Sequence, residues 1–164
     1  MLDSNKIELK KTKDSKNIQW FTVLQSKKLR FETGILVREN EWGIAFESGV
    51  FVLNNPRAYM YTLPLLEFSL KEIEYQINEP LKGMDINVNI FQDFPVTEVV
   101  RAGLDSKSEY WATLAMDWYN DFQIEDKLKL QEYILAVYKQ KGSWINQKLY
   151  HRLKKEIGIL NRLI

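Results

Sequence analysis

The sequence predicts an α+β fold, in which an antiparallel sheet of about four to six strands is packed with a C-terminal bundle of about three or four amphipathic helices. Apolar and polar residues alternate in the first half of the chain, and after Pro95 the apolar spacing becomes helical. The chain has 164 residues, 45% of them hydrophobic, which is enough for one core. We therefore expect a single domain over residues 1–164.

The predicted sheet begins in a lysine-rich region. Residues 1–17 are polar and predict a tail or an edge strand, and the β-rich part spans residues 18–91. Residues 18–25 are rich in β-branched and aromatic side chains, which indicates a strand. Alternation over residues 29–37 and again over residues 85–91 predicts two further strands, the second closing the sheet.

One hairpin has a clear turn signal. Residues 42–47 and 50–53 flank Ser48-Gly49, and glycine adopts the positive φ of a tight turn without steric cost. The segment 58–68 that follows fits either a strand or a helical turn.

A helix is predicted directly after this segment. Ser69 and Glu72 have capping-box spacing, in which each side chain satisfies an exposed amide of a helix start. Leu70, Ile73 and Ile77 then share one helical face, and the helix is expected to end before Pro80.

The helical part spans residues 95–164. Pro95 suits a first helical turn, Gly103 is expected to end that short helix, and Ser106 with Glu109 repeats the capping-box spacing. Ser143 is expected to cap the last helix. Three apolar faces are predicted: Trp111, Leu114, Ala115, Trp118 and Phe122; then Ile124, Leu128, Gln131, Leu135 and Tyr138; then Ile145, Leu149, Leu153, Ile157 and Leu160.

Charge is distributed unevenly along the chain, although the net charge is only +1. Residues 1–38 hold nine Lys/Arg and four Asp/Glu, a net charge of +5. Residues 39–126 hold five Lys/Arg and sixteen Asp/Glu (−11), and residues 127–164 hold nine and two (+7). The sequence fits either a bipolar surface or segments that neutralise one another once folded.

The chain lacks the residues that most common catalytic mechanisms require. The chain has no cysteine, which excludes disulfides, thiol catalysis and cysteine zinc sites, and no phosphate-binding glycine motif. Its one histidine, His151, lies away from the predicted apolar face of the last helix and is expected at the surface. Asp117 and Asp121 are four residues apart, but such a pair is more often a solvated face than a cation site. We expect no enzyme activity, no cofactor and no metal.

Membrane and nucleic acid are not expected as partners. No run of about 18 apolar residues occurs, residues 1–17 lack the apolar core of a secretory signal, and a cytoplasmic protein is expected. The last two helices resemble a basic helix-turn-helix, but the acidic centre would repel phosphate. Their basic residues are Lys139, Lys141, Lys148, Arg152, Lys154 and Lys155.

A family resemblance covers residues 108–155. Ser108-Glu109-Tyr110-Trp111-Ala112-Thr113-Leu114-Ala115-Met116-Asp117-Trp118, followed by the basic run His151-Arg152-Leu153-Lys154-Lys155, resembles the C-terminal region of small bacterial immunity proteins. Such proteins protect a cell from polymorphic or contact-dependent toxins by binding the cognate toxin. The resemblance implies a toxin-neutralising role and carries over no particular residue.

An acidic surface would suit a basic nuclease toxin, because complementary charge speeds encounter and excludes wrong partners. The prediction is a non-enzymatic protein-binding module that occludes the active site of a toxin. A DNA-binding regulator using the basic helices and an enzyme of unrecognised type remain alternatives. The predicted partner-binding residues are Asp105, Glu109, Asp117, Asp121, Glu125 and Asp126.

Overall fold

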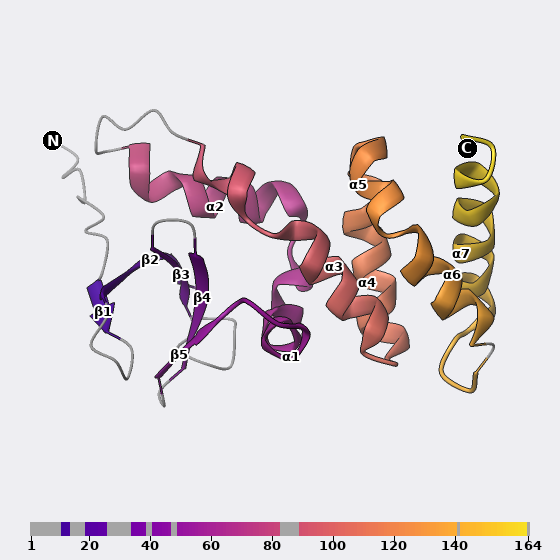
Figure 1. Ribbon diagram of the computed structural model, residues 1–164, viewed down its shortest axis with the longest axis horizontal. Coiled ribbons are helices and arrows are strands. Elements are labelled where there is room, and N and C mark those ends of the chain that lie inside the picture. The colour runs from indigo at the N-terminus through magenta and orange to yellow at the C-terminus, as the bar shows by residue number, and fades with distance from the viewer. Residues whose placement is uncertain are drawn as a thin grey trace, which may run out of the picture. The chain divides into compact units, whose positions relative to one another are not determined.

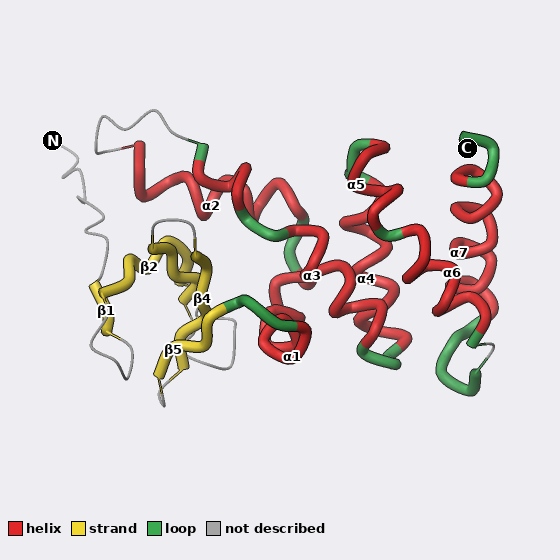
Figure 2. Tube along the Cα trace, viewed as in Figure 1, coloured by secondary structure: helices red, strands yellow, loops and turns green. Residues whose placement is uncertain are grey.

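The computed structural model describes residues 11–13, 19–25, 34–38, 41–46, 49–82, 89–140 and 142–163. The chain divides into two compact units, the first made of Met1–Ala58 with Lys71–Phe94 and the second of Tyr59–Leu70 with Pro95–Ile164. The described strands belong to the first unit, and the second consists of helices and their connections (Figures 1 and 2). The α+β class is confirmed, and a single domain over 1–164 stays a prediction.

The sheet is an antiparallel meander whose strands follow their order in the chain, so that each strand pairs with its sequence neighbour. Its strands are β1 (Lys11–Lys13), β2 (Gln19–Gln25), β3 (Gly34–Arg38), β4 (Glu41–Phe46) and β5 (Gly49–Val52). Strand β1 lies at one edge of the sheet, which agrees with the edge strand that was one of the two alternatives for residues 1–17. Residues 26–33, which include the start of the predicted strand 29–37, lie outside the described residues.

The core of the first unit contains two tryptophans. Trp20 on β2 and Trp42 on β4 are buried, and Trp42 packs edge-to-face on Phe94 with ring centroids 5.0 Å apart. Val23 and Leu24 are both buried, although consecutive strand residues normally point to opposite faces. A register shift between Thr22 and Leu24 accounts for this, since a bulge redirects the side chains that follow it.

The predicted hairpin is confirmed. Strands β4 and β5 pair antiparallel, with Phe46 opposite Gly49. Gly49 has φ +139°, a backbone conformation that side chains with a Cβ rarely adopt. Gly49, the first residue of β5, therefore allows the chain to turn from β4 into β5 without steric strain.

The ambiguous segment 58–68 is helical. It contains the end of α1 (Pro56–Tyr59) and a 3₁₀ helix, η1 (Met60–Glu67). The Asn55 side chain accepts a hydrogen bond from the Ala58 amide at 3.0 Å and so supports the start of α1. Thr62, Leu63, Leu65 and Leu66 are buried, which ties η1 into the second unit.

Two expectations near the end of the first unit are wrong. Helix α2 (Leu70–Lys82) begins directly after Ser69, but it continues through Pro80, because one missing amide near a helix end removes only one hydrogen bond. The strand expected over 85–91 is not a strand at its end, where Ile90–Asp93 forms the 3₁₀ turn η2; residues 85–88 lie outside the described residues. Phe91 stacks on Phe94 with centroids 5.8 Å apart, which holds η2 as a turn.

Five α-helices follow in the second unit: α3 (Val96–Asp105), α4 (Glu109–Asn120), α5 (Ile124–Lys129), α6 (Gln131–Lys139) and α7 (Gln147–Leu160). Helix α3 contacts η1, α4 and α6, and α7 contacts α4 and α6. The core side chains are fully or almost fully buried: Val99, Val100, Leu104, Ala112, Ala115, Met116, Trp118, Tyr119, Ile134, Leu149 and Leu153.

Three helix boundaries differ from the prediction. Gly103 does not end α3 but lies inside it, where the helix packs closely on α4. The N-cap of α4 is Ser108 rather than Ser106, and Ser106 instead donates to the Gly103 carbonyl at 2.7 Å. Asn146 rather than Ser143 caps α7, and its side chain accepts from the Leu149 amide at 2.7 Å.

The single helix predicted from Ile124 onward is two helices. Leu130 lies between α5 and α6 and is buried, with the Leu130 amide hydrogen-bonded to the Lys127 carbonyl at 3.2 Å. The bend lets Leu130 join Ile134 and Val137 in the core. As a consequence, Ile124 and Leu128, predicted on the apolar face, are exposed.

Candidate partner-binding surface

The six predicted acidic residues all lie in the second unit, but they do not form one cluster. Asp105 ends α3 and Glu109 begins α4, whereas Asp121, Glu125 and Asp126 lie beyond the other end of α4. Helix α4 has 12 residues and is therefore about 18 Å long. The structure thus separates the carboxylates into two groups, with Asp117 between them.

The carboxylates at the start of α4 are engaged within the chain. Asp105 Oδ2 lies 3.7 Å from the Nε of Arg101, which also pairs with Glu98 at 3.2 Å and lies over the Tyr133 ring, 4.4 Å from its centroid. Glu109 accepts a hydrogen bond from the Asn146 side chain. The two ion pairs of Arg101 lie within α3, whereas its contact with Tyr133 and the Asn146–Glu109 hydrogen bond reach other elements. Asp105 and Glu109 therefore both have partners within their own unit.

Asp117 is paired across the bundle. Its Oδ1 lies 2.9 Å from an Arg152 nitrogen on α7, and its side chain remains 58% exposed. Arg152 is half-buried. This pair joins the acidic middle of the chain to its basic end. At this point the segments neutralise one another, which is the alternative to a bipolar surface.

The carboxylates beyond the other end of α4 are different. Asp126 pairs with Lys129 at 2.7 Å, but among the described residues the carboxylates of Asp121 and Glu125 have no hydrogen bond and no ion pair. Both side chains are exposed. Two of the six predicted residues therefore keep a negative charge that their own unit does not neutralise.

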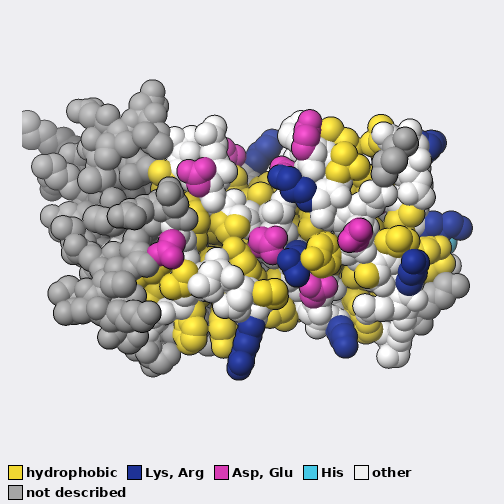
Figure 3. Space-filling model, in the orientation of Figure 1, with side chains coloured by type: hydrophobic (Ala, Val, Ile, Leu, Met, Phe, Trp, Pro, Cys, Tyr) yellow, Lys and Arg dark blue, Asp and Glu magenta, His cyan; other side chains and the backbone are white. Residues whose placement is uncertain are grey.

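Two exposed apolar side chains accompany these carboxylates. Ile124 is 39% exposed and Leu128 is 40% exposed, and both lie on one face of α5 because they are one turn apart. We call Asp121, Ile124, Glu125 and Leu128 the α5 surface. Figure 3 shows hydrophobic side chains next to a carboxylate over this helix.

The sequence predicts the two carboxylates of the α5 surface but not the exposure of its apolar pair. The spacing of Ile124 and Leu128 fits a buried face, and on that basis they were predicted in the core. The signal for exposure was present: Glu125 and Asp126 follow Ile124, and Lys127 and Lys129 flank Leu128. Such a short, highly charged segment can cover little of the core.

The aromatic residues of α4 differ in burial, and Trp118 lies in the core as its helical spacing predicts. Trp118 is 2% exposed, and its indole Nε1 donates to the Phe68 carbonyl at 2.8 Å. Trp111 is half-buried and meets Tyr110 edge-to-face at 4.8 Å. Tyr110 itself is exposed and donates to Glu67 at 2.9 Å; this hydrogen bond is the main cause that raises the pKa of the Tyr110 phenol.

The described residues contain no group of three or more His, Cys, Asp and Glu arranged to hold a metal ion. His151 is exposed on α7, and its ring meets Tyr150 at 6.0 Å. Asp121 lies beyond the end of α4, so it does not continue the helical face of Asp117.

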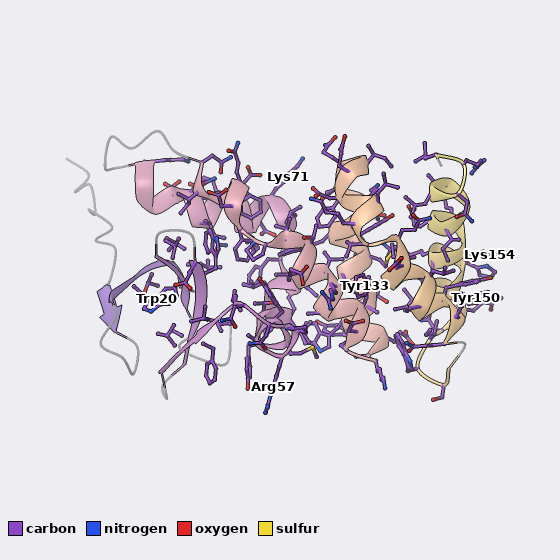
Figure 4. All side chains as sticks on the ribbon, in the orientation of Figure 1. Trp20, Arg57, Lys71, Tyr133, Tyr150 and Lys154 are labelled. Carbon is purple, nitrogen blue, oxygen red and sulfur yellow. The ribbon has the colours of Figure 1, made fainter. Side chains whose placement is uncertain are left out.

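The basic residues of α7 are partly engaged. Lys148, Lys154 and Lys155 are exposed, and Lys154 lies one turn after Tyr150 (Figure 4). Arg152 is held by Asp117. The connection between α6 and α7 spans residues 140–146, longer than the turn of about three or four residues in a helix-turn-helix. Lys141 lies outside the described residues.

No protein-family model, no curated protein and no solved structure matches the chain. In the part of the chain that the structure describes, no helix combines the length and the apolar character needed to cross a membrane.

Proposed function

We propose that this chain is a non-enzymatic protein-binding module that neutralises a cognate bacterial toxin in the cytoplasm by covering the toxin's active site. One observation carries the proposal: the α5 surface presents two carboxylates without partners among the described residues beside two exposed apolar side chains. Interfaces combine an apolar centre with charged surroundings that select the partner. A basic toxin domain supplies the complementary charge.

The first experiment identifies the partner and tests its toxicity. The full chain, carrying an affinity tag, is cross-linked in cells and recovered with its bound proteins. The proposal expects a captured protein that arrests growth when produced alone, and expects co-production of this chain to restore growth. A captured protein that is harmless, or whose toxicity the chain does not relieve, contradicts the proposal.

A variant pair then tests the surface. Asp121→Asn with Glu125→Gln removes both unpaired charges at nearly constant shape, and should weaken capture and protection, most strongly at low salt. Asp105→Asn is the matched control, because it removes one carboxylate at the other end of α4. Equal protection by all three proteins would show that the α5 surface does not bind the toxin.

The exposed lysines of α7 favour one competing function, a DNA-binding regulator. That function predicts salt-sensitive retention on DNA that is lost when Lys148, Lys154 and Lys155 are replaced by alanine. Arg152 is left unchanged in this test, because its removal would also leave Asp117 unpaired. Tight DNA binding, with no protein partner captured, would contradict the proposed function and favour the DNA-binding regulator.

A further inference from the structure

Helix α5 differs from its neighbours in contributing no buried side chain to the second unit. It has six residues, and a helix this short is marginal in water without packing partners. Its apolar residues Ile124 and Leu128 nevertheless form a ridge along one face, about 40% exposed at each position. An apolar ridge on a helix outside the core is suited to packing against something other than its own unit.

A third exposed apolar side chain lies at the same end of the second unit. Leu163 is 57% exposed and follows the end of α7. The side chains of Gln131 and Asn161 meet at 3.5 Å, which places the end of α7 beside the start of α6, directly after α5. Figure 1 shows α5 and the C-terminal end of α7 at the same end of this unit.

The charges of this end indicate what packs there. The lysines of α5 are engaged: Lys129 pairs with Asp126 at 2.7 Å, and Lys127 Nζ lies 3.2 Å from the Asn120 carbonyl and over the Tyr119 ring. The carboxylates Asp121 and Glu125 have no such partner among the described residues. The surface therefore offers negative charge beside its apolar ridge, which complements a positive partner.

We infer that the α5 surface docks a basic amphipathic helix of the protein partner, with apolar residues of that helix on Ile124 and Leu128 and its Lys or Arg side chains facing Asp121 and Glu125. A ridge with i, i+4 spacing matches the spacing of the apolar residues on an amphipathic helix. The inference rests on the proposed protein-binding function and adds the chemical class of the segment that is bound.

A synthetic helical peptide of leucine and lysine in amphipathic order tests the docking directly. Fluorescence anisotropy should show binding to the full chain, with little binding of a scrambled peptide of equal composition or of a leucine–glutamate peptide. Ile124→Ser with Leu128→Ser should weaken binding by about tenfold or more. Because both side chains are exposed, the fold should survive, and circular dichroism checks this.

Two further variants make the test specific. Asp121→Asn with Glu125→Gln should weaken binding and flatten its dependence on salt. Met60→Ser is the matched control, since Met60 is 38% exposed on η1 of the same unit, and it should bind as the unchanged chain does. Absence of peptide binding, or equal binding by the Ile124/Leu128 variant, would overturn the inference.

Sedimentation of the unchanged chain provides a second readout. A dimer that the Ile124/Leu128 variant loses would mean that a second copy occupies the ridge, and would also overturn the inference. The peptide experiment requires no toxin. Docking without a toxin partner therefore contradicts only the proposed function, and toxin protection that survives loss of the ridge contradicts only the docking.

Discussion

Arg152 illustrates how a single residue changes the meaning of a charge pattern. In the sequence, Arg152 belongs to the basic C-terminal part of the chain. In the structure it pairs with Asp117 of α4 and lies 3.5 Å from the Thr113 carbonyl. An ion pair with one exposed partner is worth at most about 1 kcal/mol, so its effect on stability is small. Its larger effect is to remove one positive charge from the exposed face of α7 and one negative charge from α4.

Gly103 lies where α3 packs closely against α4. A Cβ at this position would lie 2.6 Å from the Ala115 Cβ and 3.1 Å from the Trp111 carbonyl oxygen, both held by α4. Gly103→Ala should therefore force α3 and α4 apart and destabilise the protein by about 1–3 kcal/mol, despite the better helix propensity of alanine. Chemical unfolding followed by circular dichroism measures this.

Gly158 is the control for Gly103. It also lies within a helix, α7, but a Cβ there would meet nothing within 4 Å. Gly158→Ala should raise stability by about 0.5–1 kcal/mol, because alanine loses less backbone entropy on folding. If Gly103→Ala and Gly158→Ala changed the free energy of unfolding in the same direction, α3 would not approach α4 as closely as described.

At the scale of helices and strands, local patterns predict which elements exist better than where they end. The hairpin at Gly49, the strand at residues 19–25 and the helices α4 and α7 follow their predicted patterns. The helix over 124–138 fails because a heptad-like spacing continues across Leu130, whereas burial of Leu130 requires a bend there. A repeat of apolar residues cannot reveal such a bend, since it depends on the other helices of the core.

The candidate surface was also predicted only in part. The sequence identified Asp121 and Glu125 as acidic, but it did not distinguish them from Asp105 and Asp117. The distinction arises from Arg101 and Arg152, whose side chains reach those two carboxylates in the folded chain. Arg101 is four residues before Asp105 on α3, so that pair follows from local spacing. Arg152 comes from α7, and a partner from a distant part of the chain is invisible to a pattern that is read locally.

Asn146 joins the starts of two helices. Its side-chain oxygen accepts from the Leu149 amide and caps α7, while its side-chain nitrogen donates to Glu109 at the start of α4. Asn146→Ala should destabilise the second unit by about 1–2 kcal/mol, because the amide at the start of α7 loses its partner. The loss of helix signal on thermal unfolding measures the effect.

Ser143 distinguishes the observed cap from the predicted one. Ser143 is exposed and precedes the cap by three residues, so Ser143→Ala should change stability by no more than about 0.5 kcal/mol. Asn146→Asp keeps a capping oxygen but places a carboxylate beside Glu109, and should recover only part of the loss. If Ser143→Ala lowered stability more than Asn146→Ala, Asn146 would not be the residue that caps α7.

At the scale of the molecule, the second unit combines a well-packed core with one end that its own side chains leave incomplete. Met116 and Tyr119 of α4 and Leu153 of α7 are fully buried, whereas no side chain of α5 is fully buried. Binding surfaces are often carried by such peripheral elements on a rigid support. This arrangement suits an inhibitor, which needs a fixed scaffold more than a reactive group.

The same core contains a polar atom that makes stability depend on alkaline pH. The Tyr119 hydroxyl is buried and has no hydrogen-bond partner among the described residues. Burial, and to a smaller degree the negative charge of Glu156, raises the pKa of the Tyr119 phenol. An unfolded tyrosine loses its proton near pH 10, so above that pH the unfolded state binds fewer protons than the folded state, and stability falls as pH rises.

Tyr119→Phe removes this dependence and tests it. At pH 7 both states are protonated, and the variant should be as stable as the unchanged chain or up to about 1–3 kcal/mol more stable, because an unsatisfied buried hydroxyl is gone. At about pH 11 its advantage should grow by about 1.4 kcal/mol, the cost of one pH unit above the unfolded pKa. Urea unfolding of both proteins at the two pH values measures the difference. A variant at Tyr119 that is clearly destabilised at pH 7 would show that the hydroxyl has a partner and contributes to the core.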